Sequence, residues 1–228
     1  MQEPNDDPGT ILRWEDHIVP ILEHPAIHIR DKALVAVGWE AHPRPVEVQQ
    51  LSFSDVEDKG DHMTILLTGP QGRDRKLMIV GSAPYLRKWI QAEHPVVELL
   101  ADDAEPLKDA APGTLVWTGT ERNHYLSSAE FLSITERARK RANVTAEVTL
   151  EKLRKSRAKQ LAAKLALDNR ILRERFGWIR HVRMEDIESF IDNSSDEDIK
   201  PRPPIQCSDC GAWRPRHQPC LWCDAGRS

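Results

Sequence analysis

Residues 30–56 read RDKALVAVGWEAHPRPVEVQQLSFSDV and are the most informative stretch for the fold. Their first part, 30–41, is mostly apolar and predicts a buried helix. That helix ends at His42, because the residue before a proline is disfavoured in the helical region. Downstream, two apolar runs at 63–68 and 75–80 flank the turn sequence GPQG and predict a β-hairpin. The sequence therefore predicts a helix followed by a small antiparallel sheet.

Helical patterns account for much of the remaining sequence. A capping box at Ser127 and Glu130 opens one helix, and Gly177 is placed to end another. Residues 98–122 are rich in Asp, Pro and Gly and predict a long loop. The further predicted helices cover residues 11–23, 82–93, 149–165, 168–176 and 182–192.

The composition is that of a soluble globular protein. The 228 residues are 39% hydrophobic and 30% charged, with a formal net charge of −4. No apolar run approaches the ~20 residues that a membrane span requires, which excludes an integral membrane protein. The first ten residues are polar and predict disorder, and they lack the basic and apolar start of a signal peptide. The cysteines cluster near the end of the sequence rather than in the main body, and we predict a cytoplasmic protein.

Charge is distributed unevenly along the chain. Residues 137–183 contain fifteen Lys or Arg and four acids, whereas residues 185–198 contain seven acids and no Lys or Arg. A basic block on an acidic protein suits a polyanion-binding face. It also suits a pair of solvated helices, and composition by itself favours this second interpretation.

Two arginines fall on the apolar side of the helix predicted at 149–165. At ~100° per residue, Arg154 and Arg157 lie within the sector that holds the leucines of this helix. Either the helix opens into a polar cleft there, or the two side chains extend past the leucines to water. An arginine in a cleft suits phosphate, since its guanidinium can donate two parallel hydrogen bonds.

The four cysteines have the spacing of a metal site. Residues 207–223 read CSDCGAWRPRHQPCLWC, which is Cys-x2-Cys, nine residues, and a second Cys-x2-Cys. Two such pairs can complete a tetrahedral site of four thiolates, and a segment this short would take its folding energy from the metal. We predict a structural Zn2+ in a small zinc ribbon, rather than a redox dithiol or paired disulfides, with the ligands Cys207, Cys210, Cys220 and Cys223.

Several segments, in their order and spacing, resemble the catalytic domain of tyrosine recombinases, the phage-integrase family of DNA breaking and rejoining enzymes. The resemblance is to archaeal-type integrases in character and covers about residues 14–192. It implies a mainly α fold with a small antiparallel β-sheet. The matching segments are the stretch at 30–56, the hairpin with GSAPYLRKWIQAEHP, LSSAEFLSITERARKRANV, VTLEKLRKSRAKQLA and RERFGW.

The resemblance implies roles for three residues. In this family a tyrosine hydroxyl attacks a DNA phosphodiester to form a 3′-phosphotyrosyl link, and two arginines hold the nonbridging phosphate oxygens. By motif, Arg44 is the first arginine, with Glu47 completing Arg-x-x-Glu, and Arg154 is the second. Trp178 is the aromatic residue after the glycine of the third motif. Arg73, Lys76 and Arg157 are the further candidate DNA-binding residues.

Three positions depart from the family pattern. The hairpin lysine that acts as general acid would fall near Pro70, where the turn contains no lysine. The basic group three residues before Arg154 is replaced by Glu151. The nucleophile would fall at Ile187 or Glu188, and neither is a tyrosine. The resemblance therefore implies that the phosphate-holding residues are present while the residues that perform the chemistry are absent.

We predict a cleavage-incompetent, regulatory tyrosine-recombinase-like protein that binds double-stranded DNA. An active recombinase or a second copy is a further candidate partner, and we expect no membrane partner and no small-molecule substrate. One alternative is an active recombinase that uses Tyr125, or a tyrosine supplied by another chain. Another is a zinc-ribbon adaptor that binds proteins. The predicted organisation is a disordered segment at 1–10, a catalytic-domain-like body at 11–193, a linker at 194–204 and a zinc ribbon at 205–228.

Overall fold

The computed structural model describes residues 11–69, 74–111, 113–119 and 126–165, with side chains as far as 161, and two short strands at 205–206 and 213–214. It divides into two compact units, Met1–Arg157 and Ala158–Ser228. Each unit is described by itself. The predicted domain boundaries at 10, 193 and 204 remain predictions.

The first unit is mainly helical, as predicted. The helices expected at 11–23, 30–41, 82–93, from 128 onward and at 149–165 are all present. Two predictions were incomplete: residues 45–50 form a helix, and the loop expected at 98–122 contains two short helical turns. In chain order the helical elements are η1 (Trp14–Ile18), α1 (Val19–Glu23), α2 (Ile29–Ala41), α3 (Pro45–Gln50), η2 (Phe53–Asp55), α4 (Ala83–Lys88), η3 (Trp89–Glu93), η4 (Val97–Leu99), α5 (Pro106–Asp109), α6 (Ser128–Arg141) and α7 (Leu150–Leu165).

The predicted hairpin is present, and a third short strand extends it. The sheet contains β1 (Val56–Asp58), β2 (Met63–Leu67) and β3 (Arg75–Ile79), all antiparallel and in that order. Alternate residues of β2 are buried, which places one face of the sheet on the core. Strand β1 is only three residues long and precedes the Lys59-Gly60 turn, so alternation was too short to reveal it.

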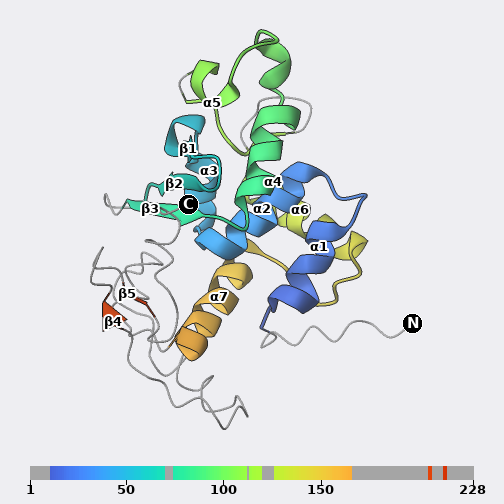
Figure 1. The fold of residues 1–228 in the computed structure, drawn as a ribbon. Coiled ribbons are helices and arrows are strands. Elements are labelled where there is room, and N and C mark those ends of the chain that lie inside the picture. Colours follow the sequence, from blue (N-terminus) through green and yellow to red (C-terminus); the bar gives the residue numbers. More distant parts are fainter. Residues whose placement is uncertain are drawn as a thin grey trace. The chain divides into compact units, whose positions relative to one another are not determined.

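Helix α2 is the centre of the first unit. It contacts α1, α4, α6 and β3, and Figure 1 shows it among these helices. Residues 33–37 are almost completely buried, so this helix has no solvated stripe. The sequence prediction of a mostly buried helix at 30–41 is confirmed.

A glycine lets α7 approach α2 closely. A Cβ atom at Gly38 would lie 2.9 Å from Leu153 Cδ1 and 3.1 Å from Leu150 Cδ2. Both leucines are buried, and each belongs to the first turn of α7. Four residues after Gly38 lies His42, and one residue after Leu153 lies Arg154. The close packing therefore brings Arg154 to the C-terminal end of α2.

In the second unit the described residues outside α7 form one small ribbon. Strands β4 (Ile205–Gln206) and β5 (Trp213–Arg214) pair antiparallel, with Ile205 opposite Arg214. The predicted helices at 168–176 and 182–192 and the linker at 194–204 lie outside the described residues. Within the described part of the chain, no helix combines the length and apolar character that crossing a membrane requires.

Candidate phosphate-binding site

The turn after α2 presents a backbone carbonyl to Arg154. His42 has φ 50° and ψ 45°, the left-handed conformation common at helix C-termini. Its Nδ1 lies 2.8 Å from the Trp39 carbonyl oxygen, so the imidazole carries its proton on Nδ1 and donates it there. The His42 carbonyl accepts a hydrogen bond of 2.6 Å from Arg154 Nη1. The buried turn thus fixes the guanidinium of Arg154.

Arg44 lies at the start of the next helix. Its extended backbone, φ −74° and ψ 153°, suits the residue before a proline, and Pro45 occupies the first position of α3. The Arg44 N–H donates to Glu47 Oε2 at 2.6 Å. This bond satisfies one of the amides left open at a helix start, and it sets the backbone of Arg44 relative to Glu47.

Arg75 joins this cluster from the sheet. Its Nη2 donates to Glu47 Oε2 at 2.5 Å, and the exposed fractions of Arg75 and Glu47 are 7% and 2%. Sequence reasoning named Arg73 and Lys76 in this region and missed Arg75. The signal was the period of two in β3, because Arg75 lies on the same face as the buried Ile79.

The three guanidinium groups interact electrostatically. The pKa of Arg154 is lowered to about 9, mainly by burial and also by the positive charges of Arg75 and Arg44, while Glu47 and Glu151 act in the opposite direction. Burial also lowers the pKa of Arg75, again with a contribution from Arg44. Three positive side chains thus lie close enough to affect one another, and a group with negative charge would favour their charged forms.

The structure therefore brings together Arg44 and Arg154, which lie 110 positions apart in the sequence. Arg154 is 6% exposed, so it does not extend past the leucines to water. Its guanidinium instead bonds a backbone carbonyl in the interior, and the polar cleft remains a prediction. Two neighbouring guanidinium groups are the kind of donors that can bind the nonbridging oxygens of a phosphate.

Arg157 has a different environment. Its guanidinium carbon lies 5.5 Å from the centre of the Trp39 ring, a distance typical of a cation–π contact. Burial lowers its pKa, and the nearby Glu40 opposes that effect. The predicted contact of Arg157 with DNA remains a prediction, and its side chain here packs on an aromatic ring.

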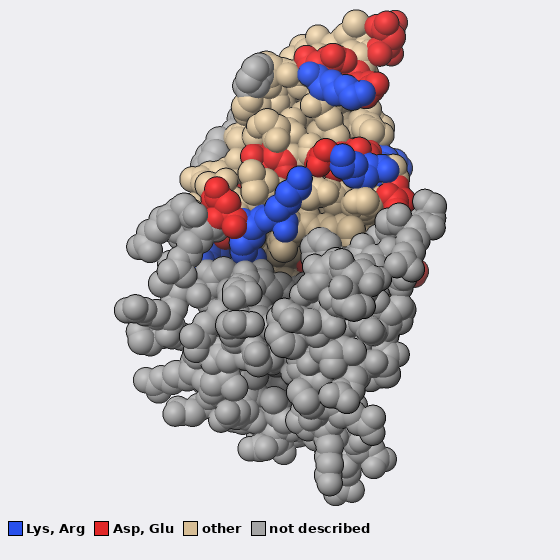
Figure 2. Space-filling view, turned by 60° about the vertical axis from the view of Figure 1, so that its left-hand side comes forward, with Lys and Arg blue, Asp and Glu red and all other residues tan. Residues whose placement is uncertain are grey.

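Two other predicted positions lie at the surface. Glu151 is exposed and pairs with Lys155 at 2.7 Å, one turn further along α7. Lys76 is exposed and lies 3.4 Å from Glu57 of β1. On the face drawn in Figure 2, the Lys and Arg side chains of the described residues lie beside Asp and Glu. The remaining predicted site residues are outside the described residues: Pro70, Arg73, Trp178, Glu188, Tyr125, Cys207, Cys210, Cys220 and Cys223.

The chain belongs to the phage integrase family, whose family model matches residues 15–185. This confirms the resemblance drawn from the sequence motifs. A comparison with curated proteins found no match.

Solved structures of recombinases share the fold. XerH recombinase, in a post-cleavage complex with palindromic difH substrate, has a TM-score of 0.57 and 19% identity, over 84% of this chain and 50% of that one. XerA recombinase has a TM-score of 0.57 and 18% identity, over 80% of this chain and 58% of that one. A lambda integrase dimer bound to a COC′ core site has a TM-score of 0.52 and 13% identity, over 85% of this chain and 62% of that one. This chain thus spans between half and about three fifths of the lengths of these structures.

Proposed function

We propose that this protein binds the phosphate backbone of double-stranded DNA through Arg44, Arg154 and Arg75, and that it regulates recombination without cleaving DNA itself. The observation that carries the proposal is the group of arginines around Glu47, whose carboxylate accepts hydrogen bonds from Arg75 Nη2 and from the Arg44 backbone N–H. XerH and lambda integrase, which have this fold, were solved bound to DNA. A phosphodiester is an anion whose oxygens can accept paired hydrogen bonds from a guanidinium group.

The absence of cleavage is inferred from the residues available for chemistry. The chain has two tyrosines, and Tyr85 lies on α4 packed against the core, remote in sequence from the expected nucleophile position at Glu188. Glu151, at the place of the expected basic group, is an acid that pairs with Lys155. The negative charge there lowers the positive potential around Arg154, where the family pattern has a basic group.

DNA binding is tested with Arg154→Ala. We expect the affinity for duplex DNA to fall about 30-fold at low salt, and the salt dependence to decrease by about one phosphate contact. Lys155→Ala removes one positive charge from the exposed side of the same helix and is the matched control. If both variants bind as the native chain does, the cluster is not the DNA site.

Cleavage is tested with a nicked suicide substrate, which traps a covalent protein–DNA adduct. We expect no adduct. An adduct that disappears in Tyr125→Phe would establish the alternative of an active recombinase that uses Tyr125. The assay is repeated with an active recombinase present. If an adduct then forms, and the active recombinase is the protein joined to DNA, the result would support a role as a partner of active recombinases.

We also propose that the cysteine-rich segment binds one structural Zn2+. Strands β4 and β5 form an antiparallel ribbon, and Cys207 and Cys210 lie between them in the sequence. A short ribbon whose connecting segment contains Cys-x2-Cys is the usual frame of a zinc knuckle. Metal analysis of the purified chain should give one zinc per chain in the native protein, and Cys207→Ser/Cys210→Ser should abolish it. A chain of unchanged fold that contains no zinc would contradict the proposal.

A further inference from the structure

A hollow of about 380 Å³ lies at the N-terminal end of α2, away from the arginine cluster. Helix α2 has thirteen residues and rises 1.5 Å per residue, so its two ends lie roughly 20 Å apart. The hollow is bounded by the segment 25–29, the first turn of α2, α4 with η3, and the end of α6. It therefore belongs to a different part of the first unit from Arg154.

Positive side chains from three helices line this hollow. Lys32 comes from α2, Lys88 from α4 and Arg141 from α6. The acid among the lining residues is Glu93, so the Lys, Arg and Glu side chains give three positive charges and one negative charge. Glu93 lies 3.8 Å from Lys88 and 3.6 Å from His28, so its contacts are long. The lining thus retains a formal excess of two positive charges.

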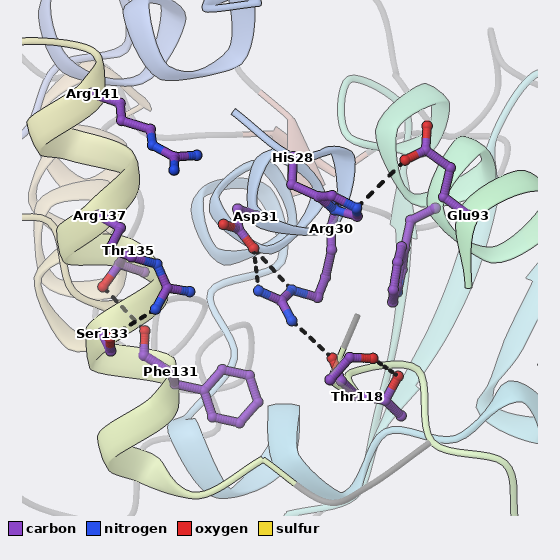
Figure 3. Close-up of polar contacts among 12 residues, drawn as sticks. His28, Arg30, Asp31, Glu93, Thr118, Phe131, Ser133, Thr135, Arg137 and Arg141 are labelled. Atoms are coloured by element: carbon purple, nitrogen blue, oxygen red, sulfur yellow. Dashed lines mark hydrogen bonds and ion pairs between the residues drawn. The ribbon is translucent and has the colours of Figure 1, made fainter. Parts of the chain in front are cut away.

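Lys32 is the least compensated of these cations. Within the described part of the chain its ammonium group has no hydrogen bond or ion pair, and partial burial together with repulsion from Lys88 lowers its pKa. Arg141 is held in place because its Nη1 donates to the Ala26 carbonyl at 3.0 Å. Figure 3 shows Arg141 on α6, His28 at the start of α2 and Glu93 on η3.

The first turn of α2 also contains Arg30 and Asp31, which are not among the residues that line the hollow. Asp31 accepts two hydrogen bonds from Arg30, at 2.8 and 2.7 Å, and Arg30 also donates to the Thr118 carbonyl at 3.1 Å (Figure 3). Both side chains are buried, so the carboxylate nearest the helix start is already occupied. The helix dipole adds partial positive charge at this end of α2.

We propose that this hollow is a second anion site, which takes a phosphate group. The phosphate can be part of a nucleic-acid backbone or a free phosphate, since the chemistry of recognition is shared. Cations from three separate elements converge on one concave surface at a helix N-terminus, which is the arrangement that favours phosphate. The proposal does not depend on the function proposed for the arginine cluster, because the two sites share no residue.

The test uses the full-length protein and inorganic phosphate, with amide NMR signals of residues 28–32 as the readout. We expect these signals to shift on addition of phosphate and not on addition of chloride at equal ionic strength. In Lys32→Gln/Lys88→Gln the apparent affinity should fall by at least about tenfold. The control Lys59→Gln/Lys108→Gln makes the same change in net charge at two exposed lysines outside the hollow, each already paired with a glutamate.

Glu93→Gln tests the same site in the opposite direction. It removes the acid that competes for Lys88, so phosphate should bind several-fold more tightly. Phosphate shifts that are absent from the native chain, or equal in the Lys32/Lys88 variant and its control, would overturn the proposal.

The source of the phosphate is found by adding duplex DNA to the Arg154→Ala variant, in which the arginine cluster is disabled. Shifts at residues 28–32 would identify a nucleic-acid backbone as the ligand. Shifts with inorganic phosphate but not with DNA would identify a small phosphate. A phosphate response that persists in Arg154→Ala would establish this second site, whether or not the variant still binds DNA.

Discussion

The two ends of α2 both gather positive charge, but they hold it in different ways. At the C-terminal end, Arg154 and Arg75 are buried, hydrogen-bonded and grouped around Glu47. At the N-terminal end, Lys88 and Arg141 are exposed and only loosely compensated. Burial makes the first cluster rigid and costly in free energy, whereas water screens the second. The C-terminal end is therefore part of the folded core. At the N-terminal end we expect substitutions of the charged side chains to leave the free energy of unfolding unchanged.

Glu47→Gln should have the largest effect on the free energy of unfolding, because it changes the buried end of α2. It removes the carboxylate that both Arg44 N–H and Arg75 Nη2 contact, and it leaves three guanidinium groups repelling one another. Breaking a buried pair in this way costs about 3 kcal/mol of unfolding free energy. Urea denaturation measures the loss, and sulfate should restore stability more than chloride does. Glu93→Gln, at the open end of α2, should unfold as the native chain does; a similar loss in both variants would contradict the comparison.

The same contrast explains which parts could be predicted from the sequence. Helices α2 and α6 follow from apolar runs, prolines and the capping box at Ser127, all of which are local signals. Arg154 was detectable because it interrupts an apolar face. The period of two in β3 places Arg75 on the buried face, but its partner Glu47 lies 28 residues earlier, and no local pattern indicates that contact. Helix α3 and strand β1 were missed because six and three residues are too few to show a period.

Gly38→Leu should affect the buried end through packing alone. A side chain here would meet Leu150 and Leu153 and push α7 away from α2. Overpacking of this kind costs about 2 kcal/mol, and Arg154 should also lose its bond to the His42 carbonyl. Both the unfolding free energy and the affinity for DNA should therefore fall. Gly81→Ala is the control, since its Cβ would lie 3.6 Å from Glu40 Oε2, at ordinary contact distance. If Gly38→Leu is destabilised but its affinity for DNA is unchanged, the packing of α7 on α2 does not position the DNA-binding arginines.

The depressed pKa of Arg154 gives a smaller, pH-dependent effect. Below pH about 9 this guanidinium is charged in both the folded and the unfolded chain, so the folded state bears the full cost of burying it. Above that pH the folded chain releases the proton while the unfolded chain keeps it. The free energy of unfolding therefore rises with pH, by at most about 1.4 kcal/mol per pH unit. Denaturation curves compared with Arg154→Met should show the native chain gaining relative stability above pH 9. A constant difference would mean that Arg154 keeps its ordinary pKa.

Glu151→His should produce the smallest change in the free energy of unfolding, because Glu151 is exposed next to the buried arginines. The exposed pair with Lys155 is lost, which costs about 0.3 kcal/mol of unfolding free energy. Removing an acid close to Arg154 raises the positive potential of the cluster, so the affinity for DNA should increase roughly twofold. Glu151→Gln removes the same charge without adding an imidazole, and it should show the same increase. If only the histidine variant binds more tightly, the added ring contacts DNA directly, and the electrostatic account of Glu151 is wrong. Neither variant should form an adduct with a suicide substrate, because a basic group at 151 supplies no nucleophile.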